Sequence, residues 1–141
     1  MQKISQDVLS SLAGVPSVGA AGEATLAVAS TADVITHSHD ISGSDALVLW
    51  YKATVTSGTP DVDLYLQQGP ILPTAQGVAG NAVDGWIQIG NKIADIVNEN
   101  WNYVTLSPVP MPFLRILADG QGSNPASCKL AFRLGRQDLF S

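Results

Sequence analysis

Two short motifs contain side chains that could bind a cation or move a proton. In THSHD (36–40), His37 and His39 share one face of an extended chain, a spacing at which two imidazoles can ligate zinc. In DVD (61–63), Asp61 and Asp63 present two carboxylates on one face, which suits calcium or an acid–base pair. Neither motif has a further ligand placed by the sequence, since the chain has no third histidine. We therefore expect solvated strand residues at both sites and no metal.

Other signatures of catalysis are missing from the sequence. It has no nucleophile elbow of the G-x-S-x-G kind and no glycine-rich loop that would cradle a phosphate. The single cysteine, Cys128, excludes an intrachain disulfide framework. It lies on the apolar face of an alternating segment, which predicts a buried structural thiol. These features predict that the protein is not an enzyme.

The charge of the chain argues against nucleic acid as a partner. Its formal net charge is −5, whereas a nucleic-acid binder needs clustered Lys and Arg to meet phosphates. Only 13% of the residues are charged, so much of the surface must be uncharged and easily buried against other proteins. The basic residues near the C-terminus predict either a strand with a basic outer face or a patch for an acidic partner. They are Arg115, Lys129, Arg133 and Arg136.

The sequence also gives expectations about location. No apolar run reaches the ~18 residues that a membrane span needs, so we expect no membrane partner. The first residues, MQKISQDVLSSLAG, place Asp and Ser where a secretion signal would be apolar. We expect a protein made in the cytoplasm.

Alternation of apolar and polar residues dominates the chain and predicts an all-β fold. The runs 47–56 and 61–67 flank the turn SGTP, a pattern typical of a β-hairpin. Short helical patterns occur at SQDVLSSLA and at KIADIVN (92–98). Further strands are predicted at 25–30, 33–41, 86–90, 102–106, 113–118 and 128–134. About seven or eight strands indicate a single antiparallel β-sandwich, jelly-roll or immunoglobulin-like. Its core is predicted to hold Leu64, Leu66, Leu114, Ile116, Leu130 and Phe132.

Two segments differ from the β-sandwich domain expected at 25–141. Residues 1–24 are mostly small and cannot form a core of their own, so they predict a flexible, extended N-terminal arm that becomes ordered on a partner. The segment 69–85 is long for a loop in a compact domain, which favours mobility or a contact role. The apolar anchors predicted in the arm are Ile4, Val8, Leu9, Leu12, Val15 and Val18.

Pro108, Pro110 and Pro112 stand at alternate positions just before a hydrophobic run. In an extended chain, alternate residues direct their N–H groups to the same side, so these prolines remove three donors from one edge. The segment is therefore expected at a sheet edge, where proline also blocks unwanted pairing, or outside the sheet. A polyproline ligand is the alternative.

Trp50 lies on the strand face opposite Leu47 and Leu49, a face that should be polar in a two-sheet sandwich. It therefore predicts packing at an oligomer interface or another contact patch. The aromatic residues as a set are expected to pack in the core or at an oligomer interface, and the alternative is the flat aromatic platform of a carbohydrate-binding module. Its members would be Trp50, Tyr65, Trp86, Trp101 and Tyr103.

The hairpin sequence LVLWYKATVTSGTPDVDLYL, the later SPVPMPFLRILADGQGSNPAS and an arm before a single sandwich resemble the small β-sandwich proteins that decorate or cement the capsids of tailed bacteriophages. The resemblance covers roughly residues 40–135. It implies a structural protein of the virion surface that binds the major capsid protein and itself, as a homotrimer or another oligomer. It also implies that the protein has neither enzymatic activity nor a cofactor. The alternative is a carbohydrate- or receptor-binding module of a phage tail or fibre.

Overall fold

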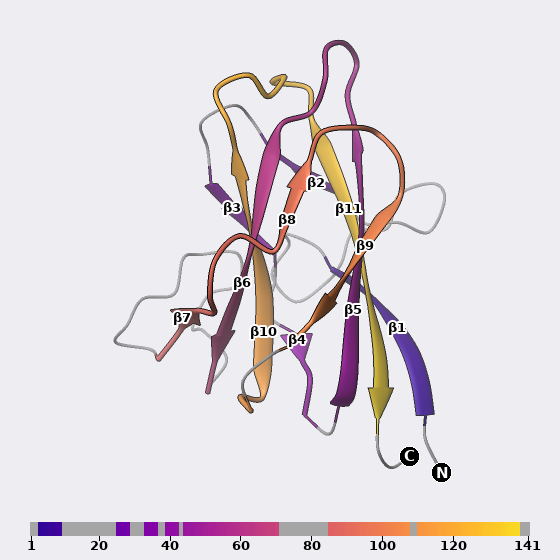
Figure 1. The fold of residues 1–141 in the computed structure, drawn as a ribbon, viewed down its shortest axis with the longest axis vertical. Coiled ribbons are helices and arrows are strands. Elements are labelled where there is room, and N and C mark those ends of the chain that lie inside the picture. The colour runs from indigo at the N-terminus through magenta and orange to yellow at the C-terminus, as the bar shows by residue number, and fades with distance from the viewer. Residues whose placement is uncertain are drawn as a thin grey trace.

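Two antiparallel β-sheets form all the regular structure described in the computed structural model. The residues that the structure describes are 3–9, 25–28, 33–36, 39–42, 44–70, 85–107 and 110–138. Within them there are eleven strands and no helix, and hence no helix that could span a membrane. The two sheets face each other across one hydrophobic core (Figure 1), so the predicted all-β fold with two antiparallel layers is confirmed.

Sheet A has five strands in the order β1-β11-β5-β9, with β2 also paired to β11. Its strands are β1 (Lys3–Leu9), β2 (Thr25–Ala27), β5 (Ser44–Thr54), β9 (Asn102–Leu106) and β11 (Lys129–Asp138). Strands β1 and β2 pair with successive parts of β11, so they share one edge of that strand.

Sheet B has six strands in the order β3-β10-β6-β7, with β4 paired to β10 and β8 paired to β6. Its strands are β3 (Asp33–Ile35), β4 (His39–Asp40), β6 (Val62–Gly69), β7 (Ile87–Gln88), β8 (Ala94–Ile96) and β10 (Phe113–Gly120). Here too short strands share an edge: β3 and β4 lie along β10, and β7 and β8 lie along β6. Each sheet is therefore four positions wide.

The core between the sheets comes from the period-two alternation of the long strands. In β6, Val62, Leu64 and Leu66 are buried, and in β11 Leu130, Phe132 and Leu134 are buried. Strands β5 and β10 contribute residues with the same spacing. The six residues predicted to share one core all belong to this cluster, so that prediction is confirmed.

The predicted β-hairpin is wrong. Strand β5 pairs with β11 and β9, whereas β6 pairs with β10, β7 and β8, so residues 55–61 connect the two sheets instead of joining neighbours in one. Both strands have a mostly apolar face, and the crossing lets those two faces meet across the core. Gly58 has φ of 86° in this connection, a conformation that glycine adopts readily.

The two helical patterns are also wrong where the structure describes them. Residues 5–9 belong to β1, and residues 94–96 of the second pattern form β8. In the second segment, hydrogen bonding to β6 overrides a pattern that spans barely two helical turns, since Ile93 N–H donates to the Leu64 carbonyl at 2.8 Å.

The segment 1–24, expected to be an arm, is described only at residues 3–9. There it forms the edge strand β1, in register with β11 from Lys3 opposite Asp138 to Leu9 opposite Phe132. The rest of the segment lies outside the described residues, as do residues 71–84 of the long loop. The domain boundary after residue 24 stays a prediction.

Candidate contact surface

An aromatic pair lies on the outer face of sheet A. Trp50 on β5 is directly opposite Tyr103 on β9, with ring centroids 4.9 Å apart and ring planes inclined at 42°. The side chains are 38% and 61% exposed, respectively. Cross-strand aromatic pairs of this kind stabilise a sheet. Here, however, the pair leaves a large apolar area in water.

The alternation of both strands explains why the pair faces outward. Leu47 and Leu49 direct their side chains into the core, so Trp50 must point away from it. In β9, Leu106 is buried and Val104 packs on the core, so Tyr103 points outward. Trp50 therefore occupies the face that the sequence predicted, and its role as a contact residue stays a prediction.

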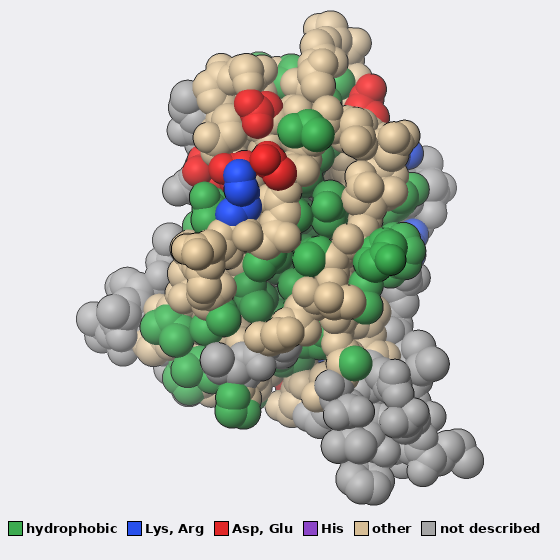
Figure 2. All heavy atoms as spheres, in the orientation of Figure 1, with side chains coloured by type: hydrophobic (Ala, Val, Ile, Leu, Met, Phe, Trp, Pro, Cys, Tyr) green, Lys and Arg blue, Asp and Glu red, His purple; other side chains and the backbone are tan. Residues whose placement is uncertain are grey.

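The other exposed large hydrophobic side chains in the described part of the chain lie on β7 or between β8 and β9. Val97 and Trp101 belong to the segment between β8 and β9, and Ile87 begins β7. We call the side of the molecule bounded by β7, β8 and β9 the open side. Figure 2 shows hydrophobic side chains gathered along the middle of this side, between the strands of the two sheets. Partly buried residues packed against the core include Ile89, Ile93, Ala94 and Val104.

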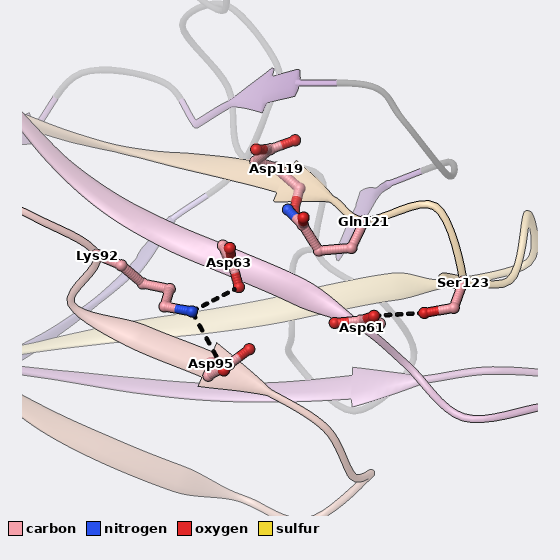
Figure 3. A network of polar contacts seen from close by, with 7 residues as sticks. All are labelled: Asp61, Asp63, Lys92, Asp95, Asp119, Gln121 and Ser123. Atoms are coloured by element: carbon pink, nitrogen blue, oxygen red, sulfur yellow. Dashed lines mark hydrogen bonds and ion pairs between the residues drawn. The ribbon is translucent and has the colours of Figure 1, made fainter.

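Three carboxylates form a row across the outer face of sheet B. Asp63 on β6 is directly opposite Asp119 on β10 and Asp95 on β8 (Figure 3). Lys92 lies over one end of the row, with Nζ 3.3 Å from Asp63 Oδ1 and 3.2 Å from Asp95 Oδ2. Burial raises the pKa of Asp63, and its hydrogen bond with Asp95 acts in the same direction, while Lys92 opposes both. The row is therefore a place where negative charge is only partly compensated.

The DVD motif does not converge on one ion. Ser123 Oγ donates a hydrogen bond to Asp61 Oδ2, and the Asp61 N–H donates to Asn124 Oδ1 at 2.9 Å. Asp61 thus faces the 121–124 turn, whereas Asp63 faces Lys92 (Figure 3). Among the residues described, no three His, Cys, Asp or Glu side chains are grouped so as to hold a metal ion.

The histidine motif is described only in part. His37 lies outside the described residues, and His39 is in β4, opposite Leu114. The neighbouring Asp40 accepts a hydrogen bond from the Ser42 N–H at 2.8 Å, and bonding to Ser42 lowers the pKa of the Asp40 carboxyl. The Arg136 guanidinium donates to the Asp40 backbone carbonyl. The contacts at Asp40 thus fasten β4 to β11 rather than form a ligand set.

Arg115 does not contribute to a basic outer face. Its side chain is 1% exposed, and its Nε donates to Gln67 Oε1 at 2.8 Å. Its Cζ lies 4.3 Å from the centroid of the Trp86 ring, which is itself 4% exposed. Gly69 leaves room for that ring, because a Cβ there would come within 2.5 Å of it. A docking patch built from all four C-terminal basic residues is thus contradicted, because Arg115 is covered.

Burial of Trp86 also removes it from the aromatic platform that the sequence allowed. Tyr65 is half-buried on sheet B, on the opposite layer from Trp50 and Tyr103. The five aromatic residues therefore form no single flat surface. What sequence reasoning missed was the pairing of Arg115 with Trp86. The signal for it was Gly69, which was expected to begin the long loop but ends strand β6 directly under the Trp86 ring.

The prolines lie outside the strands where they are described. Residues 110–112 form a bend that leads into β10, and Pro108 lies outside the described residues. Strand β10 begins directly after Pro112 and is paired on both sides, since Phe113 is opposite both Gly69 and Asp40. The expected edge strand is therefore wrong for Pro110 and Pro112. Both prolines lie in the other position that the sequence allowed, a segment that runs outside the sheet. The bend is fastened at Pro112, whose carbonyl accepts from the Ile41 N–H at 2.8 Å.

The remaining predicted contact residues fall in the N-terminal segment. Ile4, Val8 and Leu9 occupy positions in β1 opposite Gln137, Arg133 and Phe132 of β11. Leu12, Val15 and Val18 lie outside the described residues. Cys128, in contrast, is placed as predicted: it is buried in the core, and that burial raises the pKa of its thiol.

Comparison with known proteins adds no evidence about what this surface binds. No family model matches the chain, and no curated protein matches its sequence at a significant level.

Proposed function

We propose that this protein is a structural component of a virus particle. In this proposal it is a jelly-roll sandwich that binds the outer surface of a tailed-phage capsid and stabilises the shell through protein–protein contacts. It is made in the host cytoplasm, acts without catalysis or a cofactor, and has the major capsid protein and further copies of itself as partners.

The observation that carries the proposal is the order of the strands. Strands that share an edge can be counted as one position: β1 with β2, β3 with β4, and β7 with β8. In chain order the eight positions then run 1-8-3-6 in sheet A and 2-7-4-5 in sheet B. The first position pairs with the last, the second with the seventh, the third with the sixth and the fourth with the fifth.

This nested pairing supports a jelly roll, the eight-stranded sandwich of two Greek keys found in viral capsid and lectin domains. An immunoglobulin-like sandwich would instead place its first two strands side by side in one sheet. Here those positions lie in different sheets. Jelly rolls occur in viral capsid domains, so the strand order favours a protein of the virus particle. One fold supports many functions, so the strand order does not identify the partner.

The surface chemistry supports a role in assembly. Only 13% of the residues are charged, so little charge must lose its water when this surface is buried. The exposed Trp50 and Tyr103 are of the residue types that are enriched at protein interfaces.

Mass spectrometry of purified particles of the phage that encodes the chain tests the proposal. We expect the protein in the virion at a copy number close to that of the major capsid protein or a simple fraction of it. Purified protein should also bind shells that lack it and raise the temperature at which they rupture. Absence from the virion, or failure to bind shells, would contradict the proposal.

A carbohydrate- or receptor-binding module of a tail or fibre is the second candidate. The pair Trp50–Tyr103 favours it, because a sugar ring can stack on an exposed aromatic face. The burial of Trp86 and the place of Tyr65 on the other sheet leave Trp50, Tyr103 and the exposed Trp101 for the platform, and the inclination of 42° makes the paired rings uneven. This candidate predicts a few copies per virion and binding to host-cell glycans that Trp50→Ala abolishes.

A further inference from the structure

We infer that β9 pairs edge to edge with β9 of a second copy of this chain, so that sheet A continues across a twofold axis. The inference concerns self-association alone. It does not depend on whether the protein acts on a capsid, a tail or elsewhere.

The edges of the two sheets differ in their chemistry. An edge strand offers unpaired backbone groups, and proteins usually guard such edges with charge, proline or short length. The described edge strands β1, β3, β4 and β8 each contain a charged or acidic residue in their sequence, for example Asp7, Asp33, Asp40 and Asp95. Strand β7 has only two residues, and β2 has three. In contrast, β9 has five residues, NYVTL, without charge or proline.

Exposed apolar area gathers beside the edge formed by β9. In the described residues β9 pairs with β5 alone, and Tyr103 is a member of it. Trp50 packs on Tyr103, and Trp101 directly precedes the strand. These three rings expose on the order of 300 Å² together. A specific interface buries about 800 Å² per partner, and these rings supply only the part of their exposed area that faces the joined edge, Tyr103 on β9 more than Trp50 on β5. Apposed backbone edges and Val97 add to that area.

The sequence of β9 also allows the strand to pair with itself. Antiparallel pairing of all five residues places Val104 opposite Val104 of the second copy. Tyr103 is then opposite Thr105 of the second copy, and the two Tyr103 rings are diagonal neighbours on the outer face. Diagonal neighbours in a sheet are within reach of aromatic side chains. No like charges face each other in this register, because the strand contains none.

The test is the mass of the protein in solution, measured by sedimentation equilibrium over a range of concentrations. We expect the wild-type chain to form a dimer. The variant Thr105→Lys should weaken the dimer about tenfold or more, because each copy then brings an ammonium group to the shared edge. Thr105 is exposed, so the monomer should stay folded, which circular dichroism and thermal melting would verify.

A matched control is Ala126→Lys. It adds the same charge at an exposed position, but it lies in the turn between β10 and β11, strands that do not pair with β9. This variant should dimerise like the wild type. Tyr103→Glu provides a second variant at the edge, should Thr105→Lys fail to fold. Amide exchange adds a direct readout: the alternate amides of Asn102–Leu106 that point away from β5 should exchange more slowly as concentration rises in the wild type, but not in Thr105→Lys.

Three results would overturn the inference. One is a wild-type chain that sediments as a monomer up to its solubility limit. Another is association that Thr105→Lys and Tyr103→Glu leave unchanged. The third is a trimer, one of the oligomers that the capsid-protein resemblance implies, because a twofold pairing of β9 cannot produce it.

Discussion

The guanidinium group of Arg115 lies over the indole ring of Trp86, 4.3 Å from its centroid, with both side chains almost completely buried. Gln67 accepts from the Arg115 Nε at 2.8 Å, so the charge is covered and hydrogen-bonded at once. Cation–π contacts stabilise more strongly when they are removed from water. The indole N–H of Trp86, in contrast, is buried without a hydrogen-bond partner among the residues that the structure describes. Trp86 therefore makes a stabilising contact with Arg115 through its ring face, while its indole N–H is an unsatisfied donor.

This combination predicts a difference between two substitutions of Trp86. Trp86→Ala should lower the free energy of unfolding by about 3–5 kcal/mol, since it removes the ring and leaves a cavity over Arg115. Trp86→Phe should cost clearly less, because it keeps an aromatic face for the guanidinium and removes the unsatisfied N–H. Urea denaturation of the three proteins gives the comparison. An equal loss of stability in Trp86→Ala and Trp86→Phe would show that the aromatic face over Arg115 does not stabilise the fold.

A second prediction concerns Gly69, where β6 passes under the same ring. A Cβ at this position would lie 2.5 Å from two atoms of the Trp86 indole. Gly69→Ala should therefore destabilise the fold by about 1–3 kcal/mol, as expected for overpacking. Gly122→Ala is the matched control, since a Cβ there meets nothing within 4 Å. The melting temperature of the control should stay close to that of the wild type, and a similar drop in both variants would contradict the steric explanation.

The sequence predicted which residues face the core better than it predicted how strands connect. Alternation identified Leu64, Ile116 and Phe132 as core residues because a period of two depends only on local geometry. It could not tell whether the strands on either side of SGTP lie in one sheet or in two. A short Gly/Pro connection is compatible with both, and the choice depends on which strands compete for each edge. The competing partners, β11 and β10, lie far away in the sequence.

The candidate contact surface was predictable only in part. The outward position of Trp50 follows from its own strand, but its contact with Tyr103 depends on the pairing of β5 with β9. The burial of Arg115 was not predictable, because alternation places it on an outer face and only a tryptophan from another segment covers it. Long-range packing thus decides which outward residues are available to a partner.

A third prediction tests the assignment of the β11 core face. Phe132 is almost fully buried between the sheets, so Phe132→Ala should reduce the free energy of unfolding by about 3–5 kcal/mol through cavity formation. Lys129 starts the same strand and is exposed. Lys129→Ala should change stability by about 0.5 kcal/mol or less. A loss under about 1 kcal/mol for Phe132→Ala would contradict its place in the core.

The last prediction concerns the acidic row. Burial and the hydrogen bond with Asp95 raise the pKa of Asp63 in the folded protein above its value in the unfolded chain. Between these two pKa values the folded state binds more protons than the unfolded state, so stability falls as the pH rises through this range. Asp63→Asn removes the charge and should stabilise the protein at neutral pH by up to about 1 kcal/mol, the size expected for like charges directly opposite in a sheet.

The advantage of Asp63→Asn should shrink as the pH falls toward the ordinary aspartate pKa of about 3.9, because the wild-type carboxyl is then protonated in both states. Lys92→Ala should act in the opposite sense at neutral pH, since it leaves Asp63 and Asp95 facing each other without the ammonium group that lies within 3.3 Å of both. Urea denaturation of the wild type and both variants across this pH range measures these effects. If Asp63→Asn were less stable than the wild type at neutral pH, the ion pair with Lys92 would outweigh burial and the neighbouring carboxylate. The pKa of Asp63 would then lie below its ordinary value, and the acidic row would be a stabilising network.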